Sequence, residues 1–181
     1  IEPPTLVESA PGITMPTLFE KIEQKTAHVV VVGIGYVGLP LVAELARAGF
    51  RVTGLDYDRE KVRLLNAGES YIRDVPTADL APHVKARTLA ATADPAILAE
   101  ADAVVVCVPT PLNKTKEPDL CFIDAATTEI AKHQHPGMLV VLESTTYPGT
   151  TDEVVVPKLT EGGAVLGKDV FVAFSPERVD P

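Results

Sequence analysis

The chain has 181 residues, of which 46% are hydrophobic and 23% charged, a balance typical of a globular domain that excludes collagen, coiled coil and wholesale disorder. Sixteen lysines and arginines against 25 aspartates and glutamates give a formal net charge of −9 without a basic tract, so we expect no nucleic-acid partner. No apolar run approaches the ~18 residues of a membrane-spanning helix, so we expect no membrane span.

Residues 1–26 differ from the rest of the sequence. Four prolines interrupt this segment, and it lacks the pattern of a signal peptide, so we expect a partly extended arm with a short helix at 17–24. The sequence begins at Ile1 rather than Met and stops at Pro181, which leads us to expect a fragment. Cys107 and Cys121 form neither a disulfide framework nor a metal-ligand spacing, and we interpret both as buried thiols outside any disulfide, in a reducing, cytoplasmic compartment.

From residue 27 on, short apolar strands alternate with amphipathic helices. Four consecutive valines in the first strand, 27–32, indicate burial on both faces, as in a parallel sheet. An apolar stripe from Val37 to Ala48 then predicts a helix that ends at Gly49. The other expected strands are 51–56, 88–90, 103–108, 138–142 and 170–174. The other expected helices are 58–67, 77–84, 95–100, 120–133 and 150–159.

This order is βαβαβ twice over. It predicts the α/β class, namely a Rossmann-type doubly wound, mainly parallel six-stranded sheet with helices on both faces. Because crossovers between parallel strands are nearly always right-handed, few topologies remain.

A glycine-rich loop follows the first strand. Gly33, Gly35 and Gly38 form G-x-G-x-x-G between that strand and the next helix. Gly33 permits the tight turn, Gly35 lets the backbone approach a pyrophosphate, and Gly38 lets the helix pack on the strand. The alternative is a tight strand–helix turn without a ligand, but the acidic residue that follows favours a dinucleotide.

Asp56 ends the second strand, 18 residues after Gly38. A carboxylate there accepts hydrogen bonds from the ribose hydroxyls and repels a 2′-phosphate, which favours NAD over NADP. We expect Lys61, five residues later, to be within reach of the same ribose. Arg59 and Lys61 are the strongest argument for NADP, and the Asp56 carboxylate outweighs them.

Five phrases go beyond a generic nucleotide-binding fold. In chain order they are GIGYVGLPL (33–41), GESYIRDVP (68–76), VPTPLN (108–113), ESTTYPGTT (143–151) and SPERVDP (175–181). Together these motifs resemble the UDP-glucose/GDP-mannose dehydrogenase family, the nucleotide-sugar 6-dehydrogenases. They are most similar to the branch that acts on UDP-N-acetylglucosamine and UDP-N-acetylmannosamine. The resemblance implies an NAD-binding domain over 27–181, without the family's central helical and C-terminal UDP-binding domains.

The resemblance implies a reaction for the full-length parent. The C6 alcohol of a UDP-N-acetylhexosamine is oxidised twice to a carboxylate, with two NAD reduced, for polysaccharide biosynthesis. In the family, a cysteine nucleophile traps the aldehyde. The motif around that cysteine, F-G-G then cysteine then Lys-Asp, is absent from this sequence, and neither Cys107 nor Cys121 matches it. We therefore expect this chain to bind NAD and to be inactive alone, and we expect the parent to be a homo-oligomer that takes a UDP-sugar substrate.

The resemblance also implies cofactor-binding residues. Tyr36 and Val37 match loop positions whose backbone meets the pyrophosphate, and Asp56 with Lys61 matches the ribose-binding pair. Further implied contacts after two central strands are Pro109, Thr110 and Thr145.

Other matching residues have implied catalytic or substrate roles. Thr145 resembles a threonine that helps to position an active-site water. Glu177 resembles a carboxylate that supports thioester hydrolysis or orients water and that contacts substrate. Arg178 and Val179 resemble substrate contacts.

Structural alternatives remain open at this point. Thr110 could cap a turn between prolines, Thr145 could be an ordinary end-of-strand hydroxyl, and Glu177 could be a solvated carboxylate. The four histidines show no ligand pattern, so no metal site is expected. Competing functions are UDP-glucose 6-dehydrogenase, a non-catalytic NAD-sensing module and a hydroxy-acid type of two-domain dehydrogenase.

Overall fold

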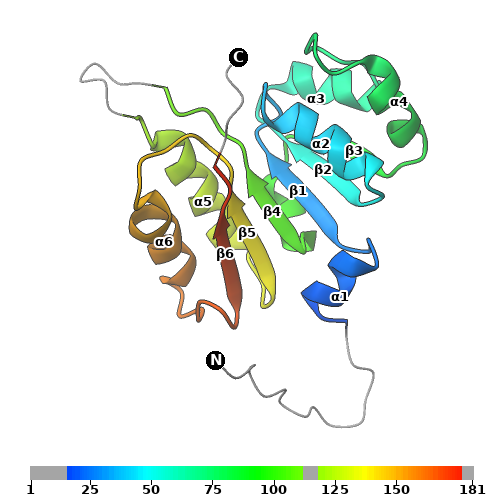
Figure 1. The fold of residues 1–181 in the computed structure, drawn as a ribbon. Helices are drawn as coiled ribbons and strands as arrows, with labels where there is room; N and C mark the ends of the chain where they lie inside the picture. Colours follow the sequence, from blue (N-terminus) through cyan, green and yellow to red (C-terminus); the bar gives the residue numbers. More distant parts are fainter. Residues whose placement is uncertain (1–15, 112–117, 177–181) are drawn as a thin grey trace.

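The structure is a computed structural model that describes residues 16–111 and 118–176. Six parallel strands form one sheet in the order β3-β2-β1-β4-β5-β6 (Figure 1). The strands are β1 (His28–Val32), β2 (Arg51–Leu55), β3 (Leu89–Thr92), β4 (Ala103–Val106), β5 (Met138–Leu142) and β6 (Val170–Phe174).

Helices connect the strands and lie on both sides of β1. In Figure 1, α2, α3 and α4 lie to one side of β1, and α5 and α6 lie to the other. The α-helices are α1 (Leu18–Glu23), α2 (Gly38–Arg47), α3 (Arg59–Asn66), α4 (Thr77–Lys85), α5 (Cys121–His133) and α6 (Val156–Thr160). Two further helical segments are the 3₁₀ helix η1 (Pro95–Glu100) and the π-helical turn η2 (Thr151–Val155).

Alternate valines of β1 enter two separate apolar clusters. Val29 and Val31 pack with α2, α3 and α4, whereas Val30 and Val32 pack with η1, α5 and α6. All five residues of β1 are buried, which confirms the two-faced burial predicted from the valine run. The predicted doubly wound parallel sheet is therefore confirmed.

Two predicted helices have a different winding from the expected one. The segment after β3 is a 3₁₀ helix that begins at Pro95, as predicted, with Asp94 as its N-cap. The segment after β5 starts as a π-helical turn and becomes α-helical at Val156. Pro157 has no N–H to donate one turn back, so a regular α-helix cannot run unbroken through this position.

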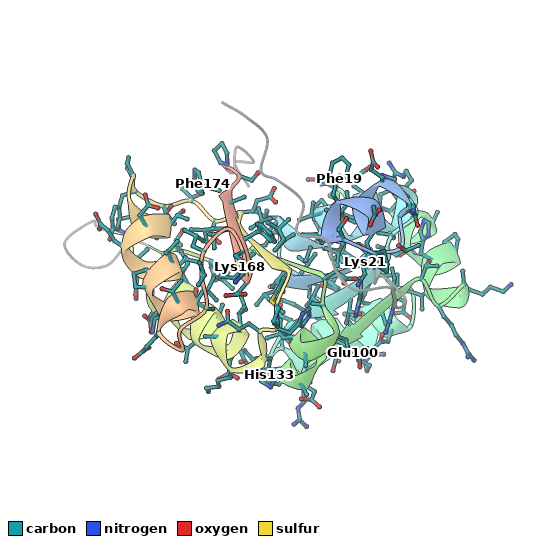
Figure 2. All side chains as sticks on the ribbon, turned by 90° about the horizontal axis from the view of Figure 1, so that it is seen from below. Phe19, Lys21, Glu100, His133, Lys168 and Phe174 are labelled. Atoms are coloured by element: carbon teal, nitrogen blue, oxygen red, sulfur yellow. The ribbon has the colours of Figure 1, made fainter. Side chains whose placement is uncertain are left out.

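The first helix, α1, is attached to the end of the sheet where the strands begin. Lys21 forms an ion pair with Asp102, and the other oxygen of Asp102 accepts the His28 N–H over 2.8 Å. Figure 2 shows the molecule from below, with Lys21 and Glu100 labelled near this end. Together with Ile22, which packs against the core, these contacts tie α1 to the domain. The division into an arm at 1–26 and a domain at 27–181 stays a prediction.

Among the described residues, no helix combines the length and the apolar composition needed to cross a bilayer.

Candidate dinucleotide-binding site

The predicted cofactor residues gather where four central strands end. The loop 33–38 follows β1, Asp56 follows β2, and the segments 107–111 and 143–146 follow β4 and β5. Chain connections leave β1 and β4 in opposite directions across the sheet, because β2 and β5 lie on opposite sides of this pair. Ligands of open α/β sheets bind in the crevice at such a switch point.

Gly33 makes the turn that leaves β1. Its φ is +88°, a region that favours glycine, and a Cβ there would lie 2.7 Å from the Cys107 carbonyl oxygen. Its N–H still donates to the Leu55 carbonyl over 2.8 Å. The turn is therefore closely packed between β2 and the end of β4, and no larger residue fits.

Gly38 and Gly35 have opposite surroundings. A Cβ on Gly38 would lie 1.8 Å from the Gly33 carbonyl oxygen, so this glycine lets α2 begin directly against the loop. A Cβ on Gly35 would meet nothing within 4 Å. The loop is therefore dense on its protein side and open at Gly35, as the approach of a pyrophosphate requires. These residues fit a dinucleotide, and α2 directs its N-terminus toward the same place.

Asp56 is held in place by its neighbours. Its Oδ2 accepts the Ile34 N–H over 3.0 Å and lies 3.4 Å from Lys61 Nζ, while its Oδ1 accepts the Asp58 N–H over 2.9 Å. The side chain is 14% exposed and that of Lys61 is 34% exposed. The predicted ribose-binding pair is therefore brought together beside the glycine-rich loop, with the carboxylate oriented before any ligand arrives.

The segments after β4 and β5 are tied to each other by hydroxyl groups. The Thr110 hydroxyl donates to the Thr145 carbonyl over 2.6 Å. The hydroxyl of buried Ser144 lies 2.9 Å from the Val108 carbonyl oxygen, to which it donates. Thr110 thus holds the backbone of Thr145. A residue that only caps its own turn would not make this contact with the segment after β5.

The remaining predicted residues are placed as follows. Tyr36 is 64% exposed at the outer side of the loop. Val37 is half-buried, and Pro109 and Thr145 are exposed. Glu177, Arg178 and Val179 lie outside the described residues. The roles proposed for all of these residues stay predictions.

Tyr71 and Ser144 are the site neighbours that sequence reasoning missed. The Tyr71 hydroxyl donates to the Ile34 carbonyl over 2.6 Å, across 37 positions of sequence. Tyr71 belongs to the motif GESYIRDVP, so the sequence indicated that this segment matters but not that Tyr71 contacts the glycine-rich loop.

The two cysteines do not have the surroundings of an activated nucleophile. Cys107 is buried at the end of β4. Cys121 is exposed, so the predicted burial is wrong for this residue, which begins α5 on the solvent side. Its hydrogen bond to the Asp119 carboxylate raises the pKa of the thiol, which favours the unreactive protonated form. Among the described residues, no three histidines, cysteines or carboxylates cluster as a metal site would require.

Comparisons with known proteins match this architecture. The model of the "UDP-glucose/GDP-mannose dehydrogenase family, NAD binding domain" matches residues 27–181. The UDP-N-acetyl-D-glucosamine 6-dehydrogenase of Pseudomonas aeruginosa is 37% identical over 87% of this chain and 36% of its own length. The UDP-N-acetyl-D-mannosamine dehydrogenase of Escherichia coli K12 is 37% identical over 86% of this chain and 38% of its own.

A solved structure supports the same relationship. The UDP-N-acetyl-mannosamine dehydrogenase Cap5O of Staphylococcus aureus superposes with a TM-score of 0.79 at 28% identity, over 86% of this chain and 38% of that protein. The chain thus spans little more than a third of the length of the relatives it matches. With its glycine-rich loop, Asp56 and parallel sheet as described, the chain belongs to the UDP-glucose/GDP-mannose dehydrogenase family and corresponds to its NAD-binding domain.

Proposed function

We propose that this chain is the cofactor-binding part of a nucleotide-sugar 6-dehydrogenase that oxidises the C6 alcohol of a UDP-N-acetylhexosamine to a carboxylate with two NAD. The observation that carries the proposal is the family match over 27–181 together with the site at the ends of β1 and β2. Curated relatives at 33–37% identity are named for UDP-N-acetylglucosamine or UDP-N-acetylmannosamine, which favours these two sugars. A cytoplasmic location and a homo-oligomeric parent belong to the same proposal.

Different residues of this chain bind different parts of the cofactor. Gly33, Gly35 and Gly38 shape the pyrophosphate site, with the backbone of Tyr36 and Val37 facing the phosphates. Asp56 and Lys61 bind the adenosine ribose. NAD supplies the hydride acceptor.

The reacting end of the site is proposed to lie at the ends of β4 and β5. Pro109, Thr110 and Thr145 border the nicotinamide, and Thr145 orients a water. Beyond β6, Glu177, Arg178 and Val179 contact the sugar nucleotide, and Glu177 supports hydrolysis. We expect the thiol nucleophile to come from elsewhere in a full-length parent.

UDP-glucose is the second candidate substrate. A UDP-glucose dehydrogenase from Pyrobaculum islandicum superposes with a TM-score of 0.74 at 29% identity over 85% of this chain. Assay of the full-length parent with UDP-N-acetylglucosamine, UDP-N-acetylmannosamine and UDP-glucose separates the candidates. We expect NADH from an N-acetylated sugar and none from the 181-residue chain alone. A parent that binds NAD and oxidises no sugar nucleotide would instead support an NAD-sensing module.

The cofactor site can be tested in the chain itself by replacing Asp56→Asn. This change removes the charge, and it replaces one of the two oxygens that accept backbone N–H groups by an NH₂ donor. We expect NAD affinity to fall at least about tenfold, since bonds to charged groups are the stronger ones. The preference for NAD over NADP should narrow, because the Asp56 charge that repels the 2′-phosphate is then removed.

Calorimetric titration with both cofactors measures these effects. Asp79→Asn is the matched control, since Asp79 lies on α4 and pairs with Arg47. Wild-type chain that binds NADP more tightly than NAD would contradict the proposal.

A further inference from the structure

The peptide groups on either side of Ile34 are held by side chains from other parts of the chain. The Ile34 N–H donates to Asp56 Oδ2 over 3.0 Å, and the Ile34 carbonyl accepts from the Tyr71 hydroxyl over 2.6 Å. The side chain of Ile34 is fully buried and lies against Gly54, where a Cβ would come within 2.7 Å of its Cγ2. Side chain, N–H and carbonyl of this loop residue are therefore all fixed.

Tyr71 reaches the loop from a well-anchored segment. It stands between α3 and α4, and its neighbour Ile72 is buried in the same apolar cluster as α2. The Ser70 hydroxyl donates to the Ile72 carbonyl over 2.9 Å, and Val75, also buried, donates its N–H to the same carbonyl. The ring of Tyr71 packs on that cluster, which restricts the positions its hydroxyl can take and places it next to the Ile34 carbonyl.

The direction of the Ile34 carbonyl decides the direction of the next N–H. A trans peptide is planar, so the carbonyl of Ile34 and the N–H of Gly35 point to opposite sides of the chain. With the carbonyl turned to Tyr71, the Gly35 N–H is turned away from it. Among the described residues no hydrogen-bond partner is found for this N–H.

The residues of the Ile34–Gly35 peptide themselves do little to restrain its orientation. Gly35 has open space around it and can adopt either sign of φ, so local sterics do not prevent the Ile34–Gly35 peptide from flipping. A flipped peptide would present a carbonyl oxygen, rather than an N–H, to an approaching phosphate. The freedom that lets a pyrophosphate come close therefore requires a restraint from outside the loop.

We propose that Tyr71 is a positioning residue for the cofactor, whose hydroxyl holds the Ile34–Gly35 peptide so that the Gly35 N–H faces the pyrophosphate of the dinucleotide. The inference rests on the proposed function only in so far as the chain binds NAD.

The protonation state of Tyr71 suits this role. Burial, reinforced by the negative charges of Asp56 and Asp58, raises the pKa of Tyr71 well above its ordinary value. The phenol therefore keeps its proton and remains a donor throughout the physiological pH range.

The test replaces Tyr71→Phe, which removes the hydroxyl and keeps the ring. Affinities for NAD, ADP-ribose and adenosine are measured by calorimetry or NMR titration of the chain. We expect NAD and ADP-ribose to bind about tenfold more weakly, because a charge-assisted phosphate contact is lost. Adenosine, which has no phosphate, should bind within about twofold of the wild type.

Thr127→Val is the matched control. Thr127 is buried in α5 and its hydroxyl donates to the Ile123 carbonyl over 2.7 Å, so the variant loses the same type of bond far from the loop. All three ligands should bind it as they bind the wild type.

Several outcomes would overturn the inference. Unchanged NAD affinity in Y71F would show that the hydroxyl does not direct the loop. Equal losses for adenosine and ADP-ribose, or failure of Y71F to fold, would show that it supports the domain in general. Wild-type chain that binds no NAD would overturn the cofactor site together with this inference, whereas the other outcomes leave the cofactor site intact.

Discussion

Gly35 and Gly38 are three positions apart in one loop, yet they are glycines for different reasons. Gly38 has the Gly33 carbonyl against it, so its lack of a side chain serves the packing of α2. Gly35 faces open space, so protein packing does not require a glycine there, and we propose that its lack of a side chain serves the ligand. The sequence motif predicts a glycine at both positions. Only the structure shows that Gly38 is required by packing and that Gly35 is not.

This difference can be tested with Gly35→Ala and Gly38→Ala, each the control of the other. G35A should melt like the wild type and bind NAD at least about tenfold more weakly, because its methyl group keeps the phosphate from a contact worth ~1.5–3 kcal/mol. G38A should lower the free energy of unfolding by about 3 kcal/mol or more, because its methyl group overpacks against backbone atoms that must shift. Thermal melts and NAD titrations measure both quantities. A G35A chain with wild-type NAD affinity would show that the pyrophosphate does not pass at Gly35.

At the scale of elements, the two edges of the sheet are formed by β3 and β6. The β3 edge is capped by one side chain of α3. Asn66 Nδ2 donates to the Ala91 carbonyl over 2.9 Å, and the Ala91 N–H donates to Asn66 Oδ1 over 2.8 Å. The Asn66 amide thus acts as a short extra strand and satisfies both backbone groups of a buried edge residue.

Asn66→Ala should therefore destabilise the domain although it removes little apolar contact. Two buried backbone groups of Ala91 lose their partners, and we expect a loss of about 1–3 kcal/mol in the free energy of unfolding. Urea denaturation measures it. Asn66→Asp keeps the acceptor for the Ala91 N–H but places an oxygen against the Ala91 carbonyl, so it should be no better than Ala. Wild-type stability in both variants would mean that water replaces the amide at this edge.

Across the whole molecule, the two ends of the sheet have different characters. The end where the strands finish carries the open loop and the exposed Thr145. The end where they begin is closed around His28, whose side chain is 3% exposed. Its Nδ1 lies 3.2 Å from the Glu100 carbonyl oxygen, which can only accept, and its Nε2 lies 2.8 Å from the Thr53 hydroxyl. One neutral tautomer satisfies both contacts, so Nδ1 carries the proton and Nε2 accepts from Thr53.

This arrangement gives the stability of the chain a defined pH dependence. Burial, together with nearby Arg51, lowers the pKa of His28 in the folded state. Below the ordinary histidine pKa near 6.5, His28 therefore binds a proton in the unfolded chain but stays neutral in the folded chain. The stabilisation is complete above that pH and is lost as the pH falls, with a slope of at most about 1.4 kcal/mol per pH unit from this residue.

Denaturation of wild type, His28→Gln and the control His83→Gln between pH 5 and pH 8 measures the effect. The wild type and H83Q should lose stability on acidification more steeply than H28Q. Equal slopes in all three proteins would show that His28 is not responsible.

Local patterns of the sequence determined the alternation of strands and helices, the valine strand buried on two faces, the glycine turn and the acid at the end of β2. These features depend on side-chain periodicity and backbone conformation within a few residues, which a sequence displays directly. Strand boundaries shifted slightly, as at β4, which ends at Val106 rather than at residue 108, because hydrogen bonding to neighbouring strands sets them.

Tertiary structure alone decided the single side-chain contacts between distant segments. Tyr71 on Ile34, Asn66 on Ala91 and Thr110 on Thr145 each join residues 25 to 37 positions apart. Such bonds have no period and leave no local signal, because they depend on where two segments meet after the sheet has formed. The sequence by itself therefore predicted a dinucleotide-binding loop, and the tertiary structure decided what holds that loop in shape.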